Sequence, residues 1–135
     1  METWLEELSE AVCQHHLARA LIGRLAVVVD GHPEVFPVNH VVDDETGDIV
    51  FPSNRRTKLY AALHGPVAFE ADGVDDGGKS AWSVVAFGRG EDITGTDEAA
   101  RAMARRVPLW AVGDYTHWVR VTPERITGRR ISVIG

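Results

Sequence analysis

The chain has 135 residues, 44% hydrophobic and 25% charged, which suits one domain with a buried core and argues against disorder. Its formal net charge of −6 provides no general basic field for nucleic acid, and no apolar run reaches the roughly 18 residues of a membrane span. The single cysteine, Cys13, excludes an internal disulfide and, with an acidic N-terminus unlike a secretory signal, predicts a cytoplasmic protein.

The N-terminal segment, residues 3–22, is predicted to form an amphipathic helix. Thr3 and Glu6 have the spacing of a capping box, in which the hydroxyl and the carboxylate each bind a backbone N–H of the first turn. The pattern ends near Gly23, a common helix terminator. Apolar residues recur along the segment with approximately helical spacing: Leu5, Leu8, Val12, Leu17 and Leu21.

Most of the remaining chain is predicted to form short antiparallel strands, because β-branched runs alternate with turns rich in Gly, Pro and Asp. Six or seven strands with few helices predict a mainly β, barrel-like domain over residues 1–135, with the barrel in 24–133. Strands are expected at 25–30, 34–43, 49–53, 67–75 and 80–94, helices at 57–64 and 97–107, and a last strand or hairpin within 116–130.

A cluster of cations interrupts this acidic chain where the strand 49–53 leads into the helix 57–64. Backbone N–H groups and the helix dipole make such a junction attractive to anions. A solvated turn whose cations cluster by chance is the alternative interpretation. Hydroxyl and cationic side chains surround the junction and would suit a phosphate: Ser53, Arg55, Arg56, Thr57 and Lys58.

The run PVNHVVDDETGDIVFPSNRRTKLYAAL resembles the pyridoxamine 5'-phosphate oxidase-like family of flavin-binding split-barrel proteins. In that family a P-V-N-(aromatic or His) strand precedes an F-R-T-like strand end and then G-T-K-L. The preceding GRLAVVVDGHPEVFPV, the later SAWSVVAFGRG and the closing HWVRVTPERITGRRI fit the same order. The resemblance covers nearly all of residues 15–133 and implies a split β-barrel.

The resemblance also implies that FMN binds non-covalently in the groove of a two-fold homodimer. Residues 37–40 would run beside the isoalloxazine ring, 51–53 would end under the ribityl chain, and Thr57 and Lys58 would hold the phosphate. Residues 82–84 would reach the flavin from the adjoining strand. The matched positions are Pro37, Val38, Asn39, His40, Phe51, Pro52, Ser53, Arg55, Arg56, Thr57, Lys58, Trp82, Ser83, Val84 and Trp118, the last closing the site from the partner chain.

Two departures from the family pattern bear on phosphate binding. Pro52 and Ser53 stand where relatives often carry Arg-Thr, and Arg56 replaces the Gly before Thr-Lys-Leu. Arg55 or Arg56 would restore the lost charge if its side chain points toward the site. If both point outward, phosphate binding would be weak.

The function that these features favour is a flavin-dependent oxidoreductase acting on an unidentified small molecule. Pyridoxamine phosphate is disfavoured as a substrate, because Arg129 and Arg130 are the only candidates for a second basic cluster. No catalytic side chain is assigned. The alternatives are a deazaflavin-dependent reductase in the same barrel and a non-catalytic dimer that binds or senses flavin.

Other candidate residues are given structural interpretations. The histidines lack metal-ligand spacing, so no metal site is predicted, and His40 is either a donor beside the flavin or an internally satisfied strand residue. Cys13 is predicted to be core. DDETGDIV is expected to be an exposed hairpin, and Gly88-Arg89-Gly90 a bulge rather than a phosphate loop.

Overall fold

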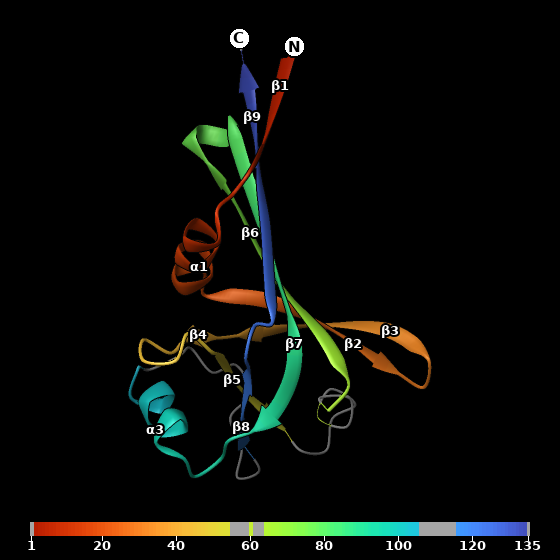
Figure 1. Cartoon of the computed structure of the whole chain (residues 1–135), viewed down its shortest axis with the longest axis vertical. Coiled ribbons are helices and arrows are strands. Elements are labelled where there is room, and N and C mark those ends of the chain that lie inside the picture. Colours follow the sequence, from red (N-terminus) through yellow and green to blue (C-terminus); the bar gives the residue numbers. More distant parts are fainter. Residues whose placement is uncertain (1, 55–59, 61–63, 106–115, 135) are drawn as a thin grey trace.

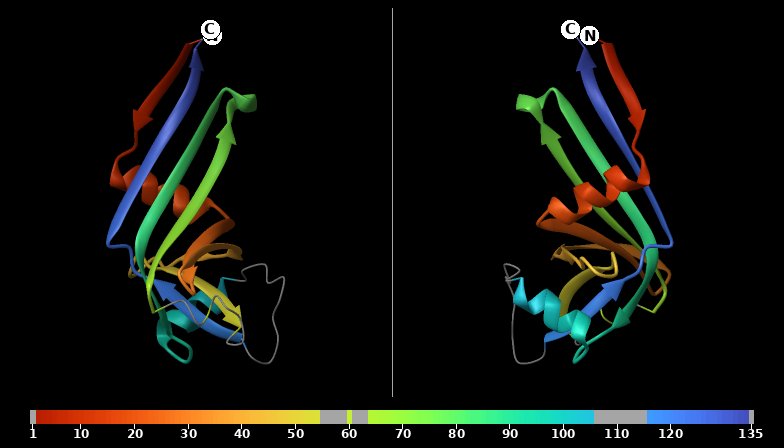
Figure 2. Two further views of the ribbon diagram at one scale, coloured as in Figure 1. Left: turned by 90° about the vertical axis from the view of Figure 1, so that its right-hand side faces the viewer. Right: turned by 60° about the vertical axis from the view of Figure 1, so that its left-hand side comes forward.

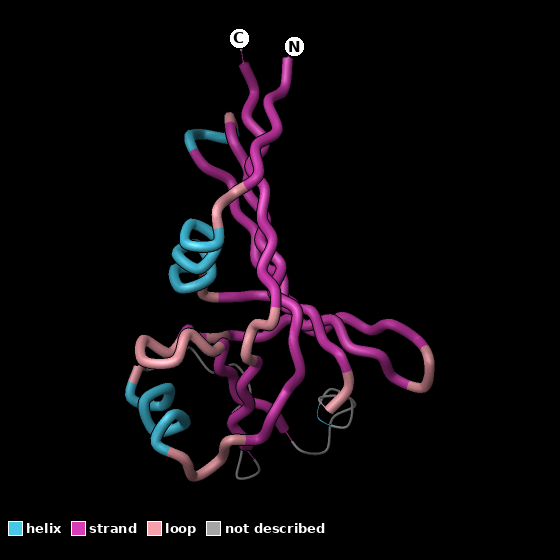
Figure 3. Tube along the Cα trace, in the orientation of Figure 1, coloured by secondary structure: helices cyan, strands magenta, loops and turns pink. Residues whose placement is uncertain are grey.

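The computed structural model describes residues 2–54, 60, 64–105 and 116–134, and strands dominate this part of the chain (Figures 1 and 3). The helices are α1 (Glu10–Arg19) and α3 (Asp97–Ala104), with a 3₁₀ turn at Asp76–Gly78. The strands are β1 (Glu2–Glu7), β2 (Ile22–Val29), β3 (His32–Asn39), β4 (Val41–Val42), β5 (Ile49–Asn54), β6 (Pro66–Asp75), β7 (Ser80–Asp92), β8 (Thr116–Val121) and β9 (Arg125–Ile134).

The predicted N-terminal helix is wrong in its first part, because residues 2–7 form strand β1 and pair with β9. The helix begins later: Ser9 is its N-cap, and its hydroxyl accepts a hydrogen bond from the Val12 N–H at 3.3 Å. Thr3 therefore caps no helix. Pairing with a strand more than 120 residues away overrides the local capping-box signal.

The sheet is antiparallel throughout, which confirms the mainly β prediction. Its strand order is β3-β2-β6-β7-β8-β5-β4, and β9 pairs with β7 on one side and β1 on the other. The C-terminal segment forms two strands that pair with β7 in different places rather than with each other, so the predicted hairpin is not formed. Figure 2 shows β6, β7, β9 and β1 side by side as an arm with both chain ends at its tip.

The segment Gly88-Arg89-Gly90 lies where β7 changes partners. Its pairing with β6 ends at Arg89, whereas its pairing with β8 begins at Gly90. A Cβ at Gly88 would lie 2.5 Å from the carbonyl oxygen of Thr122, so only glycine permits this close approach. The glycines therefore serve the bend of β7.

Two apolar clusters form the core of the described residues. The larger fills the barrel under α1, with Cys13, Leu17, Phe51 and Phe69 among its members, which confirms that Cys13 is a core residue. Burial raises the pKa of the Cys13 thiol.

The smaller cluster joins α3 to the sheet through Val50, Ile93, Ala99, Ala102 and Trp118. On the other side of α3, Met103 is 51% exposed and Ala100 is exposed, whereas Ala102 is buried. Val107 and the predicted helix 57–64, apart from Tyr60 and His64, lie outside the described residues. Neither described helix has both the length and the apolarity that crossing a membrane requires.

Candidate functional site

The end of β5 presents its side chains alternately to two sides of the sheet. Phe51 and Ser53 face the barrel interior, opposite Val119 and His117 of β8 in the pairing register. Pro52 pairs with Trp118, and this pair lies on the other side, toward α3. Ser53 is 8% exposed, and its Oγ has no hydrogen-bond partner among the described residues.

His117 belongs to a hydrogen-bonded cluster around the Asp92 carboxylate at the end of β7. The His117 Nδ1 lies 2.8 Å from Asp92 Oδ2, and the Tyr60 hydroxyl donates to the same oxygen at 2.8 Å. The other carboxylate oxygen accepts from the Thr94 N–H at 2.9 Å and from the Thr94 hydroxyl at 2.6 Å. We call Ser53, Tyr60, Asp92, Thr94 and His117 the Asp92 cluster.

The Asp92 carboxylate is strongly held in its ionised form. Burial by itself would raise the pKa of Asp92, but hydrogen bonds from Thr94, Tyr60 and His117 outweigh it and hold the pKa well below its usual range. The carboxylate accepts a hydrogen bond through His117 Nδ1, which fixes the orientation of the ring. The His117 side chain is 24% exposed, so its edge remains accessible to a ligand.

Sequence analysis missed Tyr60, Asp92 and His117 as members of a site. The three come from separate parts of the chain, and no spacing between them is typical of a motif. Their grouping depends on the register in which Ser53 lies opposite His117 and Val119 opposite Asp92. The alternation of β5 and β8 predicts which residues share a face, but it does not predict which strands are neighbours.

The predicted residues of β3 are mostly enclosed within the fold. Val38 is a core residue, and the Asn39 side-chain amide donates to the Leu21 carbonyl at 3.3 Å. His40 is 2% exposed; its Nε2 lies 2.9 Å from the Leu17 carbonyl, and its ring meets Phe69 edge-on at 4.6 Å. Burial lowers the pKa of His40, so the ring is neutral and internal.

The predicted residues of β7 lie beside α1. Val84 is fully buried, Ser83 is half-buried, and Trp82 stacks on His16 with ring centroids 4.2 Å apart. Trp82 also covers Gly73, where a Cβ would lie 2.8 Å from indole atoms. It lines a cavity of about 420 Å³ together with His16, Arg19, Leu21, Asp72 and Asp75.

Val38, Phe51 and Val84 of the predicted site share the barrel core, and other described members lie in two separate places. Asn39 and Trp82 lie near the cavity beside α1, whereas Ser53 belongs to the Asp92 cluster at the far end of β7. From Trp82 to Asp92 the strand runs for about 33 Å when fully extended. Pro37 is exposed on β3, and Arg55, Arg56, Thr57 and Lys58 lie outside the described residues.

Trp118 lies in the interior of its own chain. It is 5% exposed and packs with Val50, Ile93, Ala99 and Ala102 between the sheet and α3. Its backbone N–H donates to the Thr94 hydroxyl at 2.9 Å, which joins it to the Asp92 cluster. The indole therefore stabilises the contact between the sheet and α3 within its own chain.

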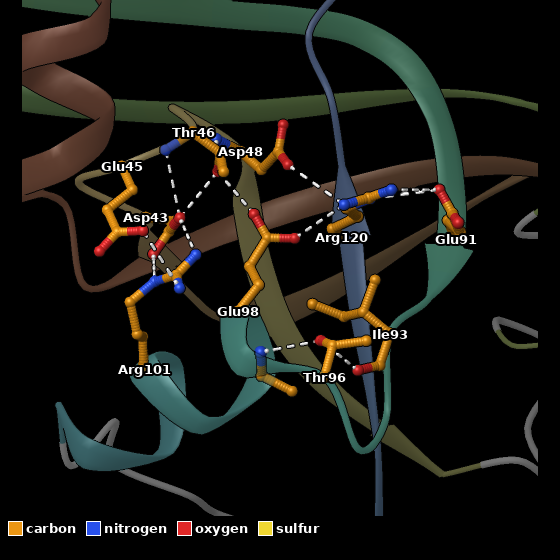
Figure 4. A network of polar contacts seen from close by, with 11 residues as sticks. Asp43, Glu45, Thr46, Asp48, Glu91, Ile93, Thr96, Glu98, Arg101 and Arg120 are labelled. Atoms are coloured by element: carbon orange, nitrogen blue, oxygen red, sulfur yellow. Dashed lines mark hydrogen bonds and ion pairs between the residues drawn. The ribbon is translucent and has the colours of Figure 1, made fainter.

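A second polar network joins α3 to the turn between β4 and β5 (Figure 4). Asp43 accepts hydrogen bonds from Arg101 at 2.9 and 3.0 Å and from the Thr46 hydroxyl at 2.8 Å. Glu98 accepts from Thr46 at 2.5 Å and from Arg120 at 3.0 Å.

The turn between β4 and β5 is the hairpin that the sequence predicted, and residues 44–47 are exposed. Asp43 and Asp48 at its base depart from that prediction, since they are 6% and 4% exposed. Hydrogen bonds from Arg101 lower the pKa of Asp43 to about 2. This network is filled by its own partners and stabilises the packing of α3. Within the described ranges, no three His, Cys, Asp or Glu side chains gather so as to hold a metal ion.

The chain matches the family model for pyridoxamine 5'-phosphate oxidase over residues 9–130, nearly its whole length. The chain belongs to the pyridoxamine 5'-phosphate oxidase family. The resemblance of the sequence to this family is thereby confirmed, and so is the split-barrel fold class.

Solved structures of the pyridoxamine 5'-phosphate oxidase type include close matches in shape. A Corynebacterium glutamicum protein, provisionally named a pyridoxamine 5'-phosphate oxidase, is 30% identical with a TM-score of 0.81; the match covers 100% of this chain and 99% of that one. An FAD-binding protein of Mycobacterium smegmatis is 35% identical with a TM-score of 0.75, covering 93% and 98%. An uncharacterized Mycobacterium tuberculosis protein is 29% identical over 93% of this chain and 84% of its own length.

Proposed function

We propose that the protein is a flavin-dependent oxidoreductase that binds FMN at the interface of a homodimer and acts on a small molecule in the cytoplasm. The observation that carries the proposal is the 35% identity, over nearly both whole chains, to the FAD-binding protein of Mycobacterium smegmatis. A bound flavin would supply the hydride or electron transfer, and the protein would bind, orient and shield it.

The division of the candidate residues into two groups supports the homodimer. Trp82 lines the cavity beside α1, whereas Ser53 lies beyond the bend of β7. In the proposed homodimer, the Trp82 group of one chain and the Ser53 group of the other would contact the same flavin.

The residues of this chain would act as binding and orienting groups. Backbone groups of residues 37–40 would face the polar edge of the ring, because the Val38 and His40 side chains are buried. Trp82 would provide an aromatic surface in a cavity that both charged residues, such as Arg19 and Asp72, and apolar residues, such as Leu21, also line. Arg55, Arg56, Thr57 and Lys58 would hold the phosphate, as the sequence predicts.

The proposal is tested by the absorbance spectrum of the purified protein and the mass of the ligand that denaturation releases. A flavin spectrum that bleaches with a reductant and returns in air, with the mass of FMN, is the expected result. The mass of FAD or of a deazaflavin would correct the cofactor. A protein that takes up neither flavin nor deazaflavin would overturn the proposal.

A non-catalytic flavin-binding protein is the second candidate, because the Mycobacterium smegmatis relative is named for FAD binding alone. The two functions differ in whether other molecules reduce and reoxidise the bound flavin. A bound flavin that no nicotinamide donor reduces, and that oxidises no added acceptor, would favour binding or sensing over catalysis.

The phosphate-binding role of the FPSNRRTKL region gives a mutational prediction. Lys58→Ala should weaken FMN binding by about tenfold or more, because a charged hydrogen bond to the phosphate would be lost. Lys79→Ala is the matched control, since Lys79 is exposed on the turn before β7. Arg89 is a poorer control, because its guanidinium donates to the His64 carbonyl at 3.0 Å. Equal effects at residues 58 and 79 in a calorimetric titration would contradict the role of Lys58.

A further inference from the structure

We propose that Ser53 and His117 together bind an anionic oxygen of the cofactor phosphate, and that Asp92 holds the His117 ring in place for this purpose. His117 would then determine the preference for a phosphorylated flavin over an unphosphorylated one. The identity of the ligand rests on the proposed function, whereas the geometry rests on the Asp92 cluster alone.

The first support is the unsatisfied Ser53 hydroxyl. Oγ of Ser53 is buried and has no partner within the described part of the chain, although a buried hydroxyl without a hydrogen bond costs about 1–3 kcal/mol. An apolar side chain would suit this position as well, because Phe51, two residues earlier on the same face of β5, is a core residue. A ligand oxygen would satisfy this hydroxyl.

The second support is the orientation of His117 on the neighbouring strand. Ser53 and His117 are directly opposed, so their Cβ atoms are about 4.5–5.5 Å apart on one face of the sheet. Asp92 engages Nδ1, and no described residue engages Nε2. An atom between the two side chains could therefore accept from the Ser53 hydroxyl and from a protonated His117 Nε2 at once.

The third support is the hydrogen bonding of the Asp92 carboxylate. Its oxygens accept from Tyr60, from Thr94 and through His117 Nδ1, and the Tyr60 and His117 ring centroids are 5.4 Å apart. The carboxylate thus holds the His117 ring at Nδ1, so a ligand would meet the ring at Nε2.

The Asp92 cluster differs from the Asp43 network in having polar atoms that a ligand could bind. The Asp43 network is closed by Arg101 and Arg120, and its carboxylates are saturated with donors. In the Asp92 cluster both carboxylate oxygens have hydrogen-bond donors, but the Ser53 hydroxyl and His117 Nε2 have no partner among the described residues. An unfilled pair of donors beside a partly exposed ring is the arrangement expected of a binding site.

The test compares the affinities of FMN and riboflavin, which differ only in the phosphate, for the full-length protein and its variants. His117→Asn is the decisive variant, because the asparagine amide can replace Nδ1 toward Asp92 but does not extend to the position of Nε2. We expect it to weaken FMN binding by a factor of about ten to a hundred and to leave riboflavin binding unchanged. His117→Gln, whose amide reaches the Nε2 position, should restore part of the preference.

Two further variants complete the comparison. Ser53→Ala should weaken FMN binding in the same selective way, and His32→Asn, at an exposed position on β3, should leave both affinities unchanged. If the His117 and Ser53 variants lose FMN and riboflavin binding by the same factor, or lose neither, the proposal is wrong. A structural role of His117 predicts the equal loss, and the phosphate role predicts the selective one.

A measurement on the wild-type chain tests the proposal even if the variants do not fold. The His117 ring resonances are followed by long-range ¹H–¹⁵N NMR, and FMN should shift the Nε2 signal whereas riboflavin should not. If neither flavin binds, the proposed function fails, and inorganic phosphate is titrated instead. A phosphate-induced shift at His117 would then support an anion site of this composition, and its absence would overturn the site as well.

Discussion

The ionised Asp43 carboxylate contributes to the stability of the fold. The carboxylate is 6% exposed and is bonded to Arg101 and Thr46, and its pKa is lowered to about 2. Asp43→Asn should reduce the free energy of unfolding by about 2 kcal/mol at pH 7, because a depressed carboxyl pKa stabilises the folded state wherever the unfolded chain is also ionised.

The same linkage fixes the direction of the pH dependence. The stabilisation by Asp43 is fully present above its ordinary pKa of about 4 and is lost as the pH falls toward 2, so the difference between wild type and variant should shrink over that interval. Urea denaturation between pH 7 and pH 3 measures this difference. Asp44→Asn, on the exposed side of the same turn, is the control. A difference that stays constant with pH would contradict the assignment.

Single residues were predictable from the sequence when their surroundings are local. Cys13 lies among apolar neighbours of its own helix, and its burial followed from that pattern. Asp43 and Asp48 were misread as exposed because their partners, Arg101 and Arg120, come from distant segments. An acidic turn is buried only when cations are brought to it, and nothing within DDETGDIV reports that.

At the level of elements, the start of α1 gives the sharpest prediction. Ser9→Ala should reduce stability by about 1 kcal/mol, because the Val12 N–H loses its capping acceptor, whereas Ser9→Asp should preserve it. Thr3→Ala should change stability by less, since Thr3 lies in β1 with an exposed side chain. Thermal unfolding of the three variants measures the difference. A larger loss of stability for Thr3→Ala than for Ser9→Ala would contradict this and would favour the helix from residue 3 that the sequence predicts.

The elements that sequence analysis located best are those with strong internal periodicity and clear turn signals. The strands β6 and β7 and the helix α3 begin close to their predicted starts. The N-terminal segment was wrong because Thr3, Glu6 and Leu5 fit a helix locally, while the exposed edge of β9 offered backbone hydrogen bonds to the same residues. Competition of this kind is decided by the tertiary structure.

At the scale of the whole molecule, the resemblance predicted the fold and the identity of candidate residues but not their positions relative to one another. A family pattern lists Ser53 and Trp82 as neighbours of one cofactor. The structure places them near opposite ends of β7, on either side of its bend at Gly88. What the sequence could not supply is the number of chains across which a complete site extends.

The strand β1 gives a prediction about how the arm of the molecule behaves in solution. All six of its residues are exposed, Trp4 and Leu5 by 60% and 61%, and among the described strands it pairs with β9 alone. With no core contacts, its opening breaks only backbone hydrogen bonds to one neighbour. In the isolated chain, therefore, the amides of β1 should exchange with deuterium much faster than those of β2, whose side chains enter the barrel core.

Hydrogen exchange followed at two protein concentrations tests this and also bears on the proposed homodimer. If a second chain covers Trp4 and Leu5, exchange in β1 should slow as the concentration rises, while exchange in β2 stays the same, because burying apolar surface stabilises only the strand that it covers. The mass of the particle by light scattering at both concentrations is the companion measurement. Protection of β1 equal to that of β2 at a concentration where the particle has the mass of one chain would contradict the prediction, since pairing with β9 alone does not provide it.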